Sequence, residues 1–125
     1  MNRAHKKLAV WTEAVALATE IYKVTESFPK SEIYGITSQM RRAVVSIPSN
    51  IAEGAARHSA HEFAQFLNIA GGSLSELDTQ IEIASNLNYI LIKKKRELEL
   101  RLDSIAKKLA GLINKIRKNI KDSEK

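Results

Sequence analysis

The chain has 125 residues and a mass of 14.0 kDa, which suits one domain and is too short for two ordinary ones. Hydrophobic residues make up 44% and charged residues 27%, a composition typical of a folded globular protein rather than a disordered one. Cysteine is absent, which excludes disulfide scaffolds, thiolate metal sites and cysteine nucleophiles. No apolar run approaches a membrane span, and the N-terminus has no apolar signal block, so we expect a cytoplasmic protein.

The net charge of +6 is concentrated near the C-terminus. Residues 1–92 carry 8 Lys/Arg against 9 Asp/Glu, whereas residues 93–125 carry 12 against 5, a net of +7. Such asymmetry indicates a local electrostatic surface for phosphates or for an acidic partner. The alternative is a solvated helix face with a basic tail, because a surface helix needs a polar side in any case.

The apolar pattern predicts a first helix over residues 8–27. Its expected buried stripe recurs at steps of three and four residues and consists of Leu8, Trp11, Val15, Ala18, Ile21 and Tyr22. Phe28 before Pro29 ends this helix, since the residue before a proline is pushed out of the helical region. Residues 30–36 then form a loop, in which Gly35 can supply a positive φ.

A second helix is expected over residues 38–57, with Thr37 as its N-cap. Its apolar stripe keeps its phase across Pro48 and consists of Met40, Val44, Ile47 and Ile51. We therefore predict one helix with a kink at Pro48, which removes the hydrogen bond to the Val44 carbonyl.

Ser59 and Glu62 have the spacing of a capping box and open a third helix over residues 60–88. Its stripe alternates steps of four and three residues through Phe63, Leu67, Ala70, Leu74, Leu77, Ile81 and Ala84. Because the phase is unbroken at Gly71 and Gly72, we predict a continuous helix in which these glycines allow a close backbone approach.

After a connection at residues 89–92, a fourth helix covers residues 94–120. Its apolar seam is Leu98, Leu102, Ile105, Leu109, Leu112 and Ile116, and several lysines lie broadly opposite it. The pairs Glu97 with Arg101 and Asp103 with Lys107 have the i,i+4 spacing of intrahelical ion pairs. Four helices with short connections predict an all-α, antiparallel up-down-up-down four-helix bundle. We expect one domain over residues 1–122 and a short flexible tail at 123–125.

The sequence carries no convincing catalytic motif. Di-iron Glu-x-x-His pairs, a P-loop, a dinucleotide-binding motif and a nucleophile elbow are all absent. His58, His61 and Glu62 superficially suggest a metal site, but their spacing fits polar residues around a helix start better. Arg57 and His61 match only in part the arginine–histidine spacing of some helical-bundle ribonucleases. We therefore expect no enzyme, no catalytic residue, no metal and no cofactor.

A polar stripe lies beside the apolar stripe of the second helix and consists of Arg42, Ser46, Asn50, Glu53 and Arg57. A structural role is favoured for Ser46, Asn50 and Glu53. Glu53 can pair with Arg42 or Arg57, and Asn50 can satisfy backbone groups that Pro48 frees. If Glu53 is buried and paired, its replacement by alanine should cost roughly 1–3 kcal/mol. For Arg41, Arg42 and Arg57, structural and phosphate-binding roles are equally open.

Several stretches carry a family pattern. They are Leu8–Trp11, Phe28–Pro29 with Glu32 and Tyr34–Gly35, Gln39–Ala43, Ser46–Gly54 with Arg57 and Ser59, Glu62–Phe63, Phe66–Leu67, and Ile69–Leu74 with Glu76. In these stretches the sequence closely resembles the bacterial four-helix bundle protein family, also called the 23S rRNA-intervening-sequence protein family. Its members include the accessory variability determinants of diversity-generating retroelements. The resemblance covers nearly all of the chain, and the fourth helix is its least diagnostic part.

The resemblance implies an antiparallel four-helix bundle that assembles into a ring-shaped homopentamer with a basic surface for nucleic acid. In retroelements the accessory protein also binds the reverse transcriptase. We therefore expect a non-enzymatic oligomer that binds nucleic acid, RNA before DNA, as an accessory or scaffold protein. The alternative is a protein-interaction module that docks on an acidic partner such as a reverse transcriptase. The expected phosphate contacts are Lys107, Lys108, Lys115 and Lys118, with Arg41, Arg42 and Arg57.

Overall fold

The computed structural model describes residues 1–124 and contains four α-helices and no strand in that range. The helices are α1 (Ala9–Thr25), α2 (Ile36–Ala55), α3 (Ala60–Asn86) and α4 (Ile92–Ser123), with short 3₁₀ helices η1 (Ala4–Lys7) and η2 (Lys30–Glu32). The predicted all-α class is confirmed. Within the same residues, no helix has both the length and the apolar character needed to span a membrane.

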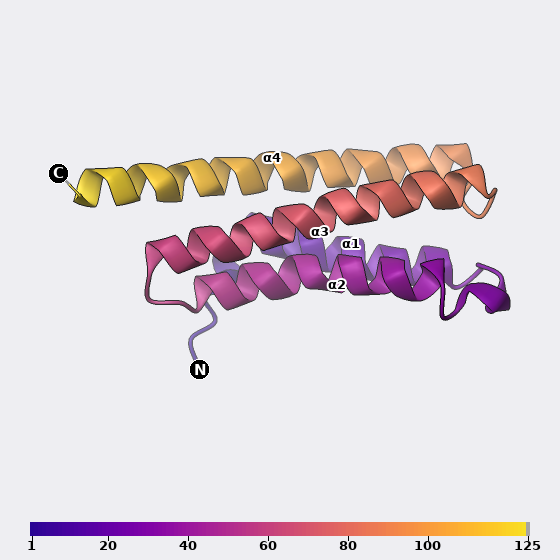
Figure 1. The fold of residues 1–125 in the computed structure, drawn as a ribbon, viewed down its shortest axis with the longest axis horizontal. Coiled ribbons are helices and arrows are strands. Elements are labelled where there is room, and N and C mark those ends of the chain that lie inside the picture. The colour runs from indigo at the N-terminus through magenta and orange to yellow at the C-terminus, as the bar shows by residue number, and fades with distance from the viewer. Residues whose placement is uncertain (125) are drawn as a thin grey trace.

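The four helices lie side by side, and the chain reverses direction at each connection (Figure 1). Contacts join α1 to α2, α2 to α3, α3 to α4 and α4 to α1, so the helices surround one common core. The contact between α2 and α3 is the most extensive, and that between α1 and α4 is the least. Figure 1 also shows the C-terminal end of α4 projecting beyond the other helices. This helix has 32 residues, and it includes Ser123 from the expected tail, while Lys125 lies outside the described residues.

The predicted core stripes of three helices are confirmed. All four stripe residues of α2 are fully buried, as are most of those of α3 and α4. Only Phe63 and Leu112 among them are half-buried, packed against the edge of the core. Because each stripe keeps the three-and-four spacing of one helix face, burial of these residues orients each helix about its own axis.

The predicted stripe of α1 is correct only in part. Ile21 is fully buried, and Leu8, Trp11 and Ala18 pack against the edge of the core. The other buried apolar residues are Val10, Ala14 and Leu17, whereas Val15 and Tyr22 are 38% and 43% exposed. The reason is that apolar residues cover more than one side of α1, apart from the positions of Glu13, Glu20 and Lys23, so two overlapping faces satisfy the same periodicity. The face of α1 that is not buried therefore keeps apolar side chains on the molecular surface.

The start of α2 also differs from the prediction. The cap position is Gly35, and Thr37 lies inside the first turn, buried, with no hydrogen-bond partner for its Oγ1 among the described residues. Gly35 has a φ of −107°, so the expected positive φ is absent there. It occurs instead at Asn88, between α3 and α4, where φ is 63° and asparagine tolerates the left-handed region. The prediction of one helix across Pro48 is confirmed.

Glycines were expected to allow close packing at Gly71 and Gly72, but a Cβ at either position would meet nothing within 4 Å. The close approach is at Gly54, where a Cβ would lie 2.8 Å from the Cβ of Phe66 and 3.2 Å from the carbonyl oxygen of Phe63. Neither atom can move without its backbone. Gly54 therefore sets the separation of α2 and α3 near their connection, and α3 is continuous through the two other glycines.

We predict that Gly54→Ala destabilises the protein by about 1–3 kcal/mol, because the added methyl forces the two helices apart. Gly111→Ala is the matched control, since a Cβ there meets open space in a helix interior. The control should stabilise the protein by about 0.4–1 kcal/mol through the unfolded state. Urea unfolding of both variants tests this, and equal effects of the two would contradict the steric role of Gly54.

Candidate nucleic-acid interface

The outer side of α4 carries a line of unpaired cations. We call these residues the α4 basic strip; each is exposed and has no ion pair or side-chain hydrogen bond within residues 1–124. They are Lys93, Arg96, Lys107, Lys115, Arg117, Lys118 and Lys121. At 1.5 Å per residue the strip runs for about 42 Å along the helix. Three of the four lysines predicted as main phosphate contacts belong to it. Lys93, Arg96, Arg117 and Lys121 were missed, although the charge count over residues 93–125 included them.

Lys108, the fourth predicted contact, is engaged elsewhere. Its Nζ pairs with the carboxylate of Glu13 on α1, which also accepts a hydrogen bond of 2.7 Å from Ser104. The hydrogen bonds from Lys108 and Ser104 hold the pKa of Glu13 below its ordinary value. Lys108 therefore links α1 to α4 instead of facing solvent as a free charge.

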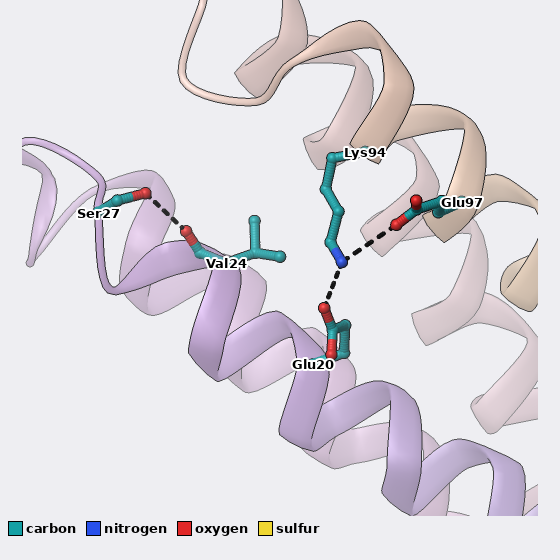
Figure 2. A network of polar contacts seen from close by, with 5 residues as sticks. All are labelled: Glu20, Val24, Ser27, Lys94 and Glu97. Atoms are coloured by element: carbon teal, nitrogen blue, oxygen red, sulfur yellow. Dashed lines mark hydrogen bonds and ion pairs between the residues drawn. The ribbon is translucent and has the colours of Figure 1, made fainter.

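Two more lysines of α4 are neutralised in the same manner. Figure 2 shows Lys94 reaching between Glu20 of α1 and Glu97 of its own helix, with 3.2 Å to the second carboxylate. The hydrogen bond to Glu20 raises the pKa of Lys94 and lowers that of Glu20. Lys95 pairs with Glu82 of α3 at 2.9 Å. Ion pairs to both neighbouring helices thus flank the strip. Arg101 is also exposed and has no ion pair within residues 1–124, but it lines a cavity with Glu13 and Ala16 of α1 and is not counted in the strip.

The two intrahelical ion pairs expected on α4 are absent. Glu97 pairs with Lys94 rather than with Arg101, and Asp103 makes no ion pair with Lys107. The i,i+4 spacing permits such pairs, but exposed pairs of this kind gain only a few tenths of a kcal/mol. Lys107 is consequently available to an external anion.

The polar stripe of α2 mainly joins α2 to α3. The hydroxyls of Ser46 and Ser73 lie 2.8 Å apart, and the Asn50 amide donates to both the carbonyl and the hydroxyl of Ser46. Asn50 therefore serves the Ser46 carbonyl and not the Val44 carbonyl that Pro48 frees, which corrects that detail of the prediction. The structural role favoured for Ser46 and Asn50 agrees with this geometry.

Glu53 and Arg57 form an ion pair of 2.6 Å, but their side chains are 54% and 42% exposed. The predicted pairing of Glu53 with an arginine is present, but the condition of burial for a large stability effect is not met. An exposed i,i+4 pair contributes about 0.3–0.5 kcal/mol, far less than a buried one. The guanidinium of Arg57 also lies over the ring of Phe66, 4.9 Å from its centroid. Arg57 is thus held against α3 and is partly neutralised.

The adjacent arginines of α2 have different environments. Arg41 donates from Nε to the hydroxyl of Thr25 at 2.9 Å and from Nη2 to the carbonyl of Tyr22 at 3.3 Å. Its guanidinium also lies 4.6 Å from the centre of the Tyr22 ring. A cation at these last carbonyls complements the negative end of α1. Arg42 is exposed and has no partner among the described residues, so of the two it is the free cation.

The histidines do not form a metal site with neighbouring carboxylates. His61 Nε2 lies 3.8 Å from Glu124 on the surface, and within residues 1–124 no group of three or more His, Asp or Glu side chains is placed to hold an ion.

Four α-helices around one core, with unpaired lysines and arginines along α4, define a small, basic, all-helical protein. The model of the 23S rRNA-intervening sequence protein family matches residues 6–111, and the chain belongs to that family. Its fold is similar to that of a protein of unknown function from the S23 ribosomal protein family of Bacteroides thetaiotaomicron, with a TM-score of 0.78. The identity is 23%, and the match covers 84% of this chain and 95% of the other. No curated protein matches.

The link between α1 and α4 predicts an acid-sensitive component of stability. The pKa values of Glu13 and Glu20 lie below the ordinary 4.5, so the unfolded chain binds more protons than the folded one in this range. Their contribution is present above pH 4.5 and is lost as the pH falls through the lowered pKa values. Because both pairs are partly exposed, we expect less than about 1 kcal/mol from each.

Thermal unfolding between about pH 6 and pH 3 should show a smaller decrease of Tm for the Glu13→Gln, Glu20→Gln double variant than for the wild type. Parallel curves would contradict the assignment.

Proposed function

We propose that the chain is a non-enzymatic, cytoplasmic accessory or scaffold protein that binds nucleic acid, RNA before DNA, through the α4 basic strip. The observation that carries this proposal is the separation of the α4 cations into two groups. Lys94, Lys95 and Lys108 are paired with carboxylates of neighbouring helices. The strip has no such partners within residues 1–124 and faces outward. The seven cations of the strip outnumber the exposed, unpaired acids beside them, Asp103 and Asp122, and a surface with such a positive excess attracts polyanions over long distances.

The chemistry of the strip suits phosphate groups rather than bases. Lysine is a point charge that contacts phosphate without reading sequence, and the strip contains no aromatic residue on which bases could stack. We therefore propose binding with little sequence preference and a strong dependence on salt.

The proposed assembly is a ring-shaped homopentamer of antiparallel up-down-up-down bundles. Apolar residues left on the surface support it: Val15 and Tyr22 on α1, and Ile69 and Ile83 on α3, are between 38% and 51% exposed. Exposed apolar side chains on two helices of one bundle suit heterologous contacts, in which different surfaces of neighbouring copies meet and the ring closes. Such a ring would repeat the α4 basic strip once per subunit.

The second candidate is a module that docks on an acidic protein such as a reverse transcriptase. It is favoured by Leu100, which is 71% exposed on a part of α4 that carries both basic and acidic residues. An exposed apolar side chain among charges of both signs adds little to phosphate binding but suits the mixed surface of a protein partner.

A charge-matched pair of variants tests the main proposal. Replacing Lys107, Lys115 and Lys118 with glutamine should weaken RNA binding equally for unrelated sequences and leave Tm unchanged, because the three side chains are exposed and unpaired. The slope of log affinity against log salt should become shallower by about 2. Each phosphate of a single strand that a lysine neutralises contributes about 0.7 to this slope, and the variant lacks three such lysines.

The control replaces Lys94, Lys95 and Lys108 with glutamine, which removes the same charge from the same helix. It should lower Tm and change the salt slope much less, since these lysines are already paired. Anisotropy titrations at several salt concentrations separate the outcomes. Equal slopes for both triple variants would show that net charge alone matters, and a wild type without salt-dependent binding to RNA or DNA would favour the acidic protein partner.

For the assembly, we predict a light-scattering mass about five times that of the 14.0 kDa chain at micromolar concentration. Val15→Lys should reduce this mass while the monomer stays folded, because the side chain lies outside the core. A monomeric wild type would reject the ring.

A further inference from the structure

A cleft lies between the first turns of α3 and the last turns of α4, at the end of the bundle where α4 projects beyond the other helices (Figure 1). Its volume is about 390 Å³, which is in the range of small-ligand sites. Arg117 and Lys121, two members of the α4 basic strip, line it from α4, and His61, Gln65 and Asn68 line it from α3. The cleft therefore connects the strip directly to polar side chains of a second helix.

Most polar groups of the cleft are free to bind a ligand. The amides of Gln65 and Asn68 and the two strip cations are exposed, and none of them has an ion pair or a side-chain hydrogen bond within residues 1–124. His61 is also exposed, and its Nε2 lies 3.8 Å from a carboxylate oxygen of Glu124. The two cations outnumber this one neighbouring acid, so the cleft keeps a positive excess.

The two amides give the cleft a capacity that the strip lacks. A carboxamide carries an acceptor oxygen and a donor NH₂ group side by side. Adenine carries the complementary pair on one edge, with a donor at N6 and an acceptor at N7. Guanine has two acceptors on the corresponding edge, and the pyrimidines have no N7. Asparagine and glutamine side chains therefore match adenine better than the other bases.

The rest of the lining suits the face of a base. Ile120 is half-buried against the core, and Ala64 is buried, so both offer an apolar surface. The imidazole of His61 is a flat ring, and bases stack on histidine as they do on larger aromatic rings. The cleft thus combines cations for phosphate, an apolar and aromatic surface for a base, and amides for the edge of that base.

We infer that this cleft binds an adenine of a single RNA strand, with the base edge on Gln65 and Asn68 and the adjoining phosphates on Arg117 and Lys121. The inference rests on the proposed function, because the α4 basic strip has to hold the strand beside the cleft. It adds a preference for one base to binding that is otherwise independent of sequence. A single strand is required because only an unpaired base can turn its edge toward a protein side chain in this way.

Short oligouridine strands with one variable central base test the chemistry in anisotropy titrations of the full chain. A central adenine should bind at least about fivefold more tightly than uracil, cytosine or guanine, the lower end of the discrimination by one bidentate base contact. A central 7-deazaadenine, which keeps the ring system but lacks the N7 acceptor, should lose most of this gain. Equal binding of all strands would overturn the inference and leave the proposed function intact. A preference for guanine would assign the base to Arg117 instead of the amides and would also overturn it.

A matched pair of double variants locates the site. Gln65→Ala with Asn68→Ala should abolish the adenine preference without lowering Tm or changing the salt slope, because the two amides are exposed, unpartnered and uncharged. Gln39→Ala with Asn86→Ala is the control, since it removes the same residue types from exposed positions outside the cleft. The control should keep the full preference. Loss of the preference in the control, or its survival in the cleft variant, would contradict the assignment.

The Lys107→Gln, Lys115→Gln, Lys118→Gln variant separates this inference from the proposed function. None of these lysines lines the cleft, so the variant should bind every strand more weakly and keep the ratio of adenine to uracil affinity. Disappearance of this ratio would place the preference on the strip and overturn the cleft assignment. A wild type that binds none of the strands would reject the proposed function and this inference together.

Discussion

The close packing of α2 on α3 is the constraint on which the rest of the structure depends. Gly54 lets the two helices approach until its backbone touches Phe63 and Phe66, and no side chain fits between them. This contact is the most extensive in the bundle, and the hydrogen bond between Ser46 and Ser73 lies along it. Once α2 and α3 are placed in this way, their outer faces are determined. α1 then packs against α2, and α4 packs against α3.

The contact between α1 and α4 follows a different physical rule. It is the least extensive of the four helix contacts, and its edge is lined by polar groups, with Glu13 and Glu20 facing lysines of α4. Pairs as exposed as these add little to stability. Their larger effect is on charge, because they neutralise the lysines closest to α1 and α3 and leave the α4 basic strip as the main group of unpaired cations. The electrostatic surface is therefore a product of helix packing as well as of composition.

The success of prediction from sequence differed among the helices for an identifiable reason. The stripes of α2 and α4 were correct because polar residues border each stripe and leave only one face that can be buried. In α1, apolar residues cover more than one side of the helix, and periodicity alone selected Val15 and Tyr22 instead of Ala14 and Leu17. The same surplus of apolar residues leaves Tyr22 on the surface, where the guanidinium of Arg41 lies over its ring.

The sequence by itself determined the helical class, the approximate helix bounds, most of the core and the basic excess near the C-terminus, because these depend on local spacing and composition. Only the tertiary structure decided that Arg41 is bound to the end of α1 while Arg42 is free, and that Lys108 is paired while Lys107 is not. Neighbours in sequence differ in this way because successive residues of a helix point about 100° apart, toward different helices or toward solvent. Packing between residues far apart in the chain decides which carboxylate or carbonyl a cation contacts. The local pattern of a single sequence does not specify these contacts.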